Sequence, residues 1–163
     1  MFRKLTIVAL AALSLAACNR QPLPDQSAQS AAFMAQNAKE PGVQTLPSGL
    51  QFKVVRSGPA NGIRPKLNDE VKVHYEGKLI DGKVFDSSYE RGQPAAMPLK
   101  ALIPAWKEAL QLMRPGDEWV LYVPPELGYG KEGAGGDIPP GAALIFRIEL
   151  IDVLPGPGST AMG

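Results

Sequence analysis

The sequence predicts an α+β fold in which an antiparallel sheet of five to six strands wraps around one short helix. Three observations support this prediction. Apolar residues alternate along several short runs, a single stretch has helical periodicity, and Gly and Pro number 17 and 16 among 163 residues. Since Gly and Pro are typical of turns, that share indicates many turns between short strands. A hydrophobic content of 45% is enough for a packed core and excludes wholesale disorder.

The strands are expected in five short segments of the chain. Alternating apolar residues predict strands over residues 50–55, 71–79, 119–123 and 143–153. The dipeptide Asp81-Gly82 favours a tight turn, so residues 83–85 are expected to return as a hairpin partner of the preceding strand.

The helix is expected over residues 103–113. Apolar side chains at positions 106, 109, 110 and 113 follow the i, i+3, i+4, i+7 spacing of one helix face. Pro104 suits the first helical turn, and the dipeptide after residue 114, Pro115-Gly116, ends the helix. A sheet with a single helix has one face to cover, so a ligand is expected in the cleft between the two.

The N-terminus has the charge and hydropathy pattern of a secretory signal. Two basic residues precede an uncharged run over residues 5–17, which is shorter than the ~20 apolar residues that a transmembrane helix needs. The letters LAAC at 15–18 resemble a bacterial lipobox, so we expect residues 1–17 to be a lipoprotein signal peptide and Cys18 to be the lipid attachment site. A plain signal peptide and a core helix with a buried thiol are the alternatives. The residue after the Cys is Asn and not Asp, which is typical of lipoproteins that reach the outer membrane, so we expect an envelope protein there that faces the periplasm.

The rest of the chain divides into a tether, one domain and a tail. Residues 18–45 are rich in Gln, Ala, Ser and Pro and are expected to form the lipidated Cys and a flexible tether, with a short helix over 28–39 as the alternative. The domain is expected over 46–154. A Pro-Gly-Pro-Gly run then ends the last strand, so residues 155–163 are expected to form a disordered tail.

Composition excludes several classes of function. Lys and Arg number 17 against 16 Asp and Glu, so no basic surplus is present for binding a nucleic acid. One Cys and one His exclude a disulfide framework and a zinc cluster. The Gly-rich run over 128–136 lacks the GK[ST] end of a phosphate-binding loop, and a mobile flap is expected there instead.

Five sequence blocks resemble one known family. The longest is VHYEGKLIDGKVFDSS at residues 73–88. The others are IPAW at 103–106, MRPGD at 113–117, PPELGYG at 124–130, and IPP at 138–140 followed by LIFRIEL at 144–150. In order and spacing these blocks resemble the FKBP-type peptidyl-prolyl cis-trans isomerases. The resemblance implies a five- or six-stranded antiparallel sheet wrapped on a short helix, and catalysed rotation of Xaa-Pro peptide bonds.

The resemblance also implies a proline-binding pocket, carried over position by position. The residues implied to act in catalysis are Tyr75, Phe85, Asp86, Trp106, Tyr129 and Phe146. The residues implied to contact the substrate are Arg91, Leu102, Ile103 and Ile138. In this interpretation Trp106 is the floor of the pocket, Tyr129 donates a hydrogen bond to a substrate carbonyl, and Arg91 keeps Asp86 ionised. Periodicity alone would instead place Trp106, Phe85 and Phe146 in the core, and His74 on the opposite face of its strand.

At some rim positions the chain departs from the small members of the family. Ala95 stands where they have Phe, Met97 replaces an aromatic residue, and Ala134 replaces a His. These departures concern the rim of the pocket more than its floor. They therefore bear on substrate preference and on the affinity for macrolides.

Two functions are compatible with this resemblance. The first is an isomerase that accelerates Xaa-Pro bond rotation during the folding of exported proteins, by desolvation and hydrogen bonding in an apolar pocket. The alternative is a chaperone or binding module of the same fold with little isomerase activity. The presence of all the pocket aromatics favours the enzyme. The expected partners are proline-containing polypeptides, tacrolimus-type macrolides and a membrane reached through the lipid anchor. No cofactor, metal or nucleic acid is expected. The short tether predicts a monomer.

Overall fold

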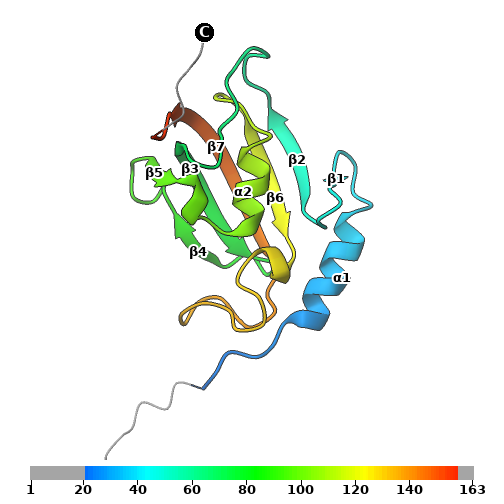
Figure 1. Cartoon of the computed structure of the whole chain (residues 1–163). Coiled ribbons are helices and arrows are strands. Elements are labelled where there is room, and N and C mark those ends of the chain that lie inside the picture. The colour runs from blue at the N-terminus through cyan, green and yellow to red at the C-terminus, as the bar shows by residue number, and fades with distance from the viewer. Residues whose placement is uncertain (1–20, 158–163) are drawn as a thin grey trace, which may run out of the picture.

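The structure is a computed structural model and describes residues 21–157. These residues form one antiparallel sheet of seven strands and two α-helices (Figure 1). The helices are α1 (Ser27–Asn37) and α2 (Pro104–Leu110), and two 3-10 turns are η1 (Leu99–Ala101) and η2 (Pro125–Leu127). The strands are β1 (Gln44–Thr45), β2 (Gln51–Arg56), β3 (Glu70–Leu79), β4 (Val84–Ser87), β5 (Ala95–Pro98), β6 (Glu118–Val123) and β7 (Leu144–Leu154). The predicted α+β class with an antiparallel sheet is confirmed. The sheet contains two strands, β1 and β5, beyond the five segments located in the sequence, and α1 is a second helix.

The predicted signal peptide over residues 1–17 and the predicted lipid attachment site Cys18 lie outside the described residues. Most of the predicted tail, residues 158–163, also lies outside them. Between residues 21 and 157, no helix is both long enough and apolar enough to cross a membrane.

The long strand β3 organises the sheet. The strand order is β1-β2-β6-β7-β3-β4, and β3 pairs with β7 from Glu70↔Leu154 to Leu79↔Leu144. On its other edge, β5 pairs with the first half of β3 and β4 with the second half. Between the two halves of β3, Ser88 bonds to the backbone of Tyr75. It donates its N–H to the Tyr75 carbonyl at 2.9 Å and accepts the Tyr75 N–H on Oγ at 2.8 Å. The backbone on both sides of Tyr75 is therefore fixed by three neighbouring segments.

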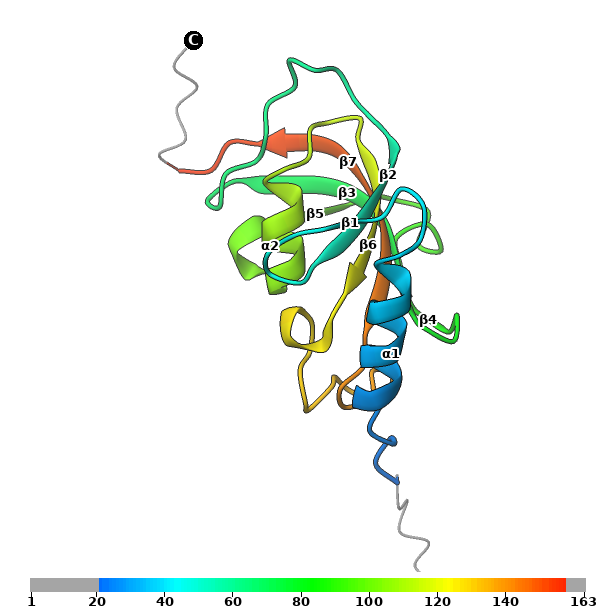
Figure 2. The ribbon, with the colours of Figure 1, turned by 90° about the vertical axis from the view of Figure 1, so that its right-hand side faces the viewer.

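Helix α2 lies across one face of the curved sheet (Figures 1 and 2). The apolar stripe predicted at positions 106, 109, 110 and 113 is confirmed, because all four side chains are buried. They belong to the same core as the alternating inward residues of β7, which are Leu144, Phe146, Ile148 and Leu150. The helix itself is shorter than predicted: it begins with Pro104 at its first position and ends at Leu110.

Helix α1 corrects the interpretation of residues 18–45 as a flexible tether. Residues 27–37 form a helix on the other side of the sheet from α2 (Figure 2), where the Phe33 ring lies 6.2 Å from that of Tyr122 on β6. Polar side chains fix it: Ser30 and Asn37 are buried, and Asn37 Nδ2 donates to Gln51 Oε1 at 2.8 Å. Because these contacts are tertiary and the helix has no strong apolar stripe, periodicity did not predict its docking.

The turn after α2 is closed by Asp117. Its Oδ2 accepts the Arg114 N–H at 3.0 Å, and its Oδ1 accepts the Gly58 N–H at 2.6 Å. Asp117 is only 7% exposed, and both of these hydrogen bonds are partly buried. The carboxylate thus ties the end of α2 to the loop that follows β2 and fixes the helix on the sheet.

We predict that Asp117→Ala lowers the free energy of unfolding by about 1–3 kcal/mol, because two partly buried N–H groups lose their carboxylate acceptor. Urea denaturation followed by tryptophan fluorescence measures this value. The control is Asp137→Ala, since Asp137 is exposed and forms only a 3.4 Å ion pair with Lys83. The control is expected to lose less than about 0.5 kcal/mol. Equal losses for the two variants would contradict the role given to Asp117.

Candidate active site

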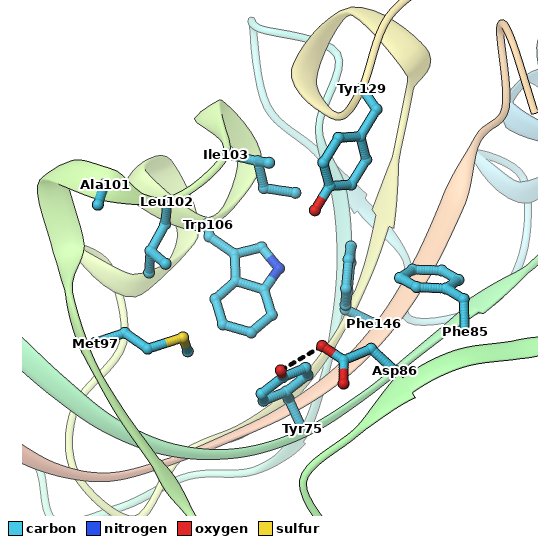
Figure 3. A pocket seen from close by; sticks show the side chains of 10 residues that line it. All are labelled: Tyr75, Phe85, Asp86, Met97, Ala101, Leu102, Ile103, Trp106, Tyr129 and Phe146. Carbon is cyan, nitrogen blue, oxygen red and sulfur yellow. Dashed lines mark hydrogen bonds between the residues drawn. The ribbon is translucent and has the colours of Figure 1, made fainter. Parts of the chain in front are cut away.

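A cavity of about 300 Å³ opens between α2 and the sheet (Figure 3). Its walls come from four strands, the η1 turn, α2 and the loop after η2. The residues that line it are Tyr75, Phe85, Asp86, Met97, Ala101, Leu102, Ile103, Trp106, Tyr129 and Phe146. Most of these side chains are apolar or aromatic, as in most small-ligand sites, and few polar groups reach the interior.

The floor of the cavity is the indole of Trp106. The Phe146 ring meets it at 5.2 Å between centroids and 86° between planes, and the Tyr75 ring meets it at 5.0 Å and 83°. Phe85 packs against Phe146 in the same edge-to-face manner, at 5.7 Å and 90°. Each such pair stabilises the arrangement by about 0.5–1.5 kcal/mol beyond burial of its area. The aromatic rings therefore hold one another in a defined position around the cavity.

The indole nitrogen of Trp106 is buried and has no hydrogen-bond partner among the described residues. In Figure 3 it lies on the side of the indole that faces Phe146 and Tyr129. The face of an aromatic ring attracts such an N–H weakly, which favours the observed edge-to-face geometry with Phe146.

Gly77 on β3 makes room for two of these rings. A Cβ at this position would lie 2.6 Å from Cε1 of Phe146 and 2.7 Å from Cζ of Phe85. Any side chain there would displace both rings, so only glycine is compatible with this wall of the cavity. Our sequence analysis did not assign Gly77 to the site. A glycine inside a strand is the signal that indicates such a close approach.

Asp86 forms the polar side of the cavity together with Tyr75 and Arg91. The Tyr75 hydroxyl donates to Asp86 Oδ2 at 2.5 Å, and Arg91 donates from one guanidinium nitrogen to Asp86 Oδ1 at 2.5 Å. The other terminal nitrogen of Arg91 donates to the Tyr75 hydroxyl at 3.0 Å. The carboxylate is thus held by two donors from different segments, at the edge of an otherwise apolar cavity.

These contacts set the protonation states. Partial burial raises the pKa of Asp86, but the hydrogen bonds from Tyr75 and Arg91 outweigh burial, so this pKa lies below its ordinary value. The pKa of the Tyr75 hydroxyl is raised, first by burial and then by its bond to Asp86. Burial and the charge of Asp86 also raise the pKa of Tyr129. At neutral pH the cavity therefore contains one carboxylate and two neutral phenols.

The structure brings most of the expected site residues together. Eight of the ten line the cavity. Arg91 does not line it and instead contacts Asp86 and Tyr75 from outside. Ile138 belongs to the core and lies outside the set of lining residues. Met97, which the sequence placed at the rim of the pocket, also lines the cavity, and so does Ala101, which was not among the predicted site residues.

Besides the indole N–H of Trp106, two hydrogen-bond donors on residues that line the cavity have no partner among the described residues. Tyr129 is 39% exposed, and in Figure 3 its hydroxyl points into the cavity. The Ile103 carbonyl accepts the N–H groups of Trp106 and Lys107 at 3.0 and 3.1 Å. The N–H of Ile103 has no acceptor within residues 21–157. Both donors can therefore bond to a ligand.

Comparisons with known proteins identify the family that this chain resembles. The family profile described as FKBP-type peptidyl-prolyl cis-trans isomerase matches residues 62–151. A second profile, described as the domain amino terminal to FKBP-type peptidyl-prolyl isomerase, matches residues 10–54.

Individual relatives cover most of this chain but only part of their own length. Peptidyl-prolyl cis-trans isomerase Mip of Coxiella burnetii is 57% identical over 125 residues, which are 77% of this chain and 54% of the relative. Outer membrane protein MIP of Legionella longbeachae is 46% identical over 129 residues, 79% of this chain and 54% of the relative. The crystal structure of FkpA from Escherichia coli superposes with a TM-score of 0.75 at 46% identity, over 80% of this chain and 60% of that one. The chain therefore spans slightly more than half the length of these curated relatives.

We predict that Arg91→Gln raises the pKa of Asp86 toward its ordinary value, because the variant removes a charged donor from the carboxylate. Carboxyl ¹³C NMR titration measures this pKa directly. A folded-state pKa below the unfolded one means that the ionised form stabilises the fold above about pH 4, and this stabilisation is lost as the pH falls through the folded-state pKa.

The matched control is Lys83→Gln, which removes an exposed cation that pairs with Asp137. In this control the pKa of Asp86 is expected to be the same as in the wild type. A midpoint for Asp86 that does not change in Arg91→Gln would contradict the ion pair.

Proposed function

This chain belongs to the FKBP-type peptidyl-prolyl cis-trans isomerase family, and we propose that its cavity binds Xaa-Pro segments and accelerates rotation about the prolyl peptide bond. The observation that carries this proposal is the aromatic cavity floored by Trp106. The proposed substrates are proline-containing polypeptides during the folding of exported proteins.

The chemistry requires only that the barrier to rotation be lowered. Twisting the C–N bond destroys amide resonance, which gives a barrier of about 18–20 kcal/mol. For Xaa-Pro the two isomers differ little in free energy, and uncatalysed exchange takes tens to hundreds of seconds. The planar amide is more dipolar than the twisted one, so an environment poor in water disfavours the ground state more than the transition state. A dry aromatic cavity can act in this way without a nucleophile.

The cavity has room for a prolyl ring. Its volume of about 300 Å³ is roughly twice the ~150 Å³ in which a benzene ring can be buried. A pyrrolidine ring is smaller than benzene and would lie on the Trp106 indole, with Phe85, Phe146 and Tyr75 beside it. The remaining volume would take the residue before proline, next to Met97 and Leu102.

The polar groups at the mouth would orient the twisted amide. The hydroxyl of Tyr129 and the N–H of Ile103 are donors suited to substrate carbonyls on either side of the proline. Asp86 stays ionised beside Arg91, so it acts as a fixed charge that orients Tyr75 and not as a general base. The mechanism thus combines desolvation with positioned hydrogen bonds.

The proposed cellular location rests on the N-terminal sequence and on a relative. Residues 1–17 have the pattern of a signal peptide, and Cys18 follows the small residues of a lipobox. The relative from Legionella longbeachae is named an outer membrane protein. We therefore place this protein in the outer membrane through acyl chains on Cys18, with the domain facing the periplasm. Each buried methylene of such a chain would contribute about 0.8 kcal/mol to membrane binding.

We predict that Trp106→Leu lowers kcat/KM at least tenfold in a protease-coupled assay on an Xaa-Pro peptide, because the floor under the prolyl ring is lost. The matched control is Trp119→Leu. Trp119 is similarly buried but stacks on Phe52 at 4.4 Å, away from the cavity. Both variants remove core volume and are destabilised by about 2–5 kcal/mol, so activity is compared at equal folded fraction.

The control is expected to keep activity within about twofold of the wild type. Equal losses in the two tryptophan variants would exclude a specific role for Trp106. Turnover by the wild-type protein that does not exceed the rate in buffer would instead favour a binding module of the same fold.

We predict that Cys18→Ser releases the protein from the membrane fraction, because no thiol remains for lipid attachment. Cell fractionation followed by immunoblotting measures the distribution. Cys18→Ser protein that stays in the membrane fraction would refute lipid anchoring at this residue.

A further inference from the structure

We propose that helix α1 is part of the catalytic unit and that Ser30 is a positioning residue that sets the place of Tyr129. This inference rests on the proposed function, because it assigns Tyr129 a role in catalysis. It goes beyond that function by connecting the cavity to a helix on the far side of the sheet (Figure 2).

Ser30 joins α1 to the segment that leads into β7. Its side chain is fully buried, and its hydroxyl donates to the Gly141 carbonyl and accepts the Ala143 N–H, both at 2.7 Å. A serine hydroxyl can make both bonds at once. Next to it, the Gln26 N–H donates to the Pro140 carbonyl at 2.8 Å. The first turn of α1 thus fixes the backbone of residues 140–143.

The same backbone fixes the residue after Tyr129. The Gly141 N–H donates to the Gly130 carbonyl at 2.9 Å, and the Gly130 N–H donates to the Pro125 carbonyl at 2.8 Å. Two hydrogen bonds therefore connect the Ser30 hydroxyl to Gly130. At Gly141 the φ angle is +67°, and a Cβ there would lie 2.1 Å from the Ser27 hydroxyl oxygen. The approach of α1 to this segment is therefore close and specific.

Tyr129 depends on this backbone more than the other aromatic residues of the cavity do. No described residue forms a hydrogen bond with its hydroxyl, and the side chain is 39% exposed. By contrast Trp106, Tyr75 and Phe146 are held by edge-to-face contacts with one another. The Tyr129 carbonyl accepts the Gly133 N–H at 3.2 Å, and the next residue, Gly130, is held by Pro125 and by Gly141, which Ser30 contacts. The position of the Tyr129 hydroxyl is thus set through this main chain.

The other end of α1 provides a natural control. Asn37 is buried and donates to Gln51 Oε1 at 2.8 Å, while Gln51 Nε2 donates to the Met34 carbonyl at 2.9 Å. These bonds dock the same helix onto β2 and do not lead to Gly130. Loss of either anchor loosens α1, but only loss of the Ser30 anchor is expected to reach Tyr129.

The test compares Ser30→Ala and Asn37→Ala in the full-length chain, each with Tyr129 intact and in a Tyr129→Phe background. Ser30→Ala is expected to lower kcat/KM about three- to tenfold at equal folded fraction, the size of effect that one lost hydrogen bond produces. Asn37→Ala is expected to change it by less than about twofold. In the Tyr129→Phe background the effect of Ser30→Ala is expected to fall below twofold, because the hydroxyl that it positions is gone.

Hydrogen exchange measured by mass spectrometry supplies the second readout. Ser30→Ala should accelerate exchange in residues 128–143, and Asn37→Ala should not. Equal losses of activity in both Tyr129 backgrounds, or equal losses for Ser30→Ala and Asn37→Ala, would overturn the proposal. If the wild-type chain has no isomerase activity, the proposed function fails, and hydrogen exchange alone tests whether Ser30 holds the backbone next to Tyr129. Faster exchange over 128–143 in Ser30→Ala then supports this link, and unchanged exchange overturns it.

Discussion

The site depends on one contact, the edge-to-face packing of Trp106 against Phe146 and Tyr75. Trp106 comes from α2, whereas its two partners come from β7 and β3, so this contact joins the helix to the centre of the sheet. The same indole belongs to the core and lines the cavity. Gly77 is needed for it, because a side chain there would displace Phe146 and Phe85. The packing of the fold and the shape of the cavity are therefore set by the same rings.

Charge is confined to one edge of this cavity. Asp86 is compensated by Arg91 and by the Tyr75 hydroxyl, which keeps it ionised without placing an uncompensated charge against the aromatic floor. The interior is mostly apolar, and Tyr129 and Ile103, which line it, each carry a donor without a partner among the described residues. This separation suits a reaction in which a dipolar amide must lose its hydration while its carbonyl oxygens still find hydrogen bonds.

The sequence predicted those parts of the fold that are encoded by periodicity. Alternation in β7 and the stripe from Trp106 to Met113 identify the two faces that meet in the core, and the Asp81-Gly82 turn identifies the β3–β4 hairpin. Strand β5 was missed because its two alanines form a strand only by pairing with β3, as in Val73↔Ala95. Helix α1 was missed as a docked element because buried polar bonds from Ser30 and Asn37 fix it. Most of the candidate site came from family resemblance, since periodicity cannot distinguish a core aromatic residue from one that faces a cavity. Ile138, transferred in the same way, is not among the lining residues, and its contact with a substrate stays a prediction.

The most direct measurement is a structure of this protein bound to a proline-containing peptide, by crystallography or by intermolecular NMR contacts. The account predicts that the prolyl ring lies flat on the Trp106 indole, with apolar atoms within about 4.5 Å, and that a carbonyl of the peptide accepts from Tyr129 or Ile103. A peptide bound elsewhere on the sheet, with the Trp106 indole covered by the protein's own side chains, would contradict it.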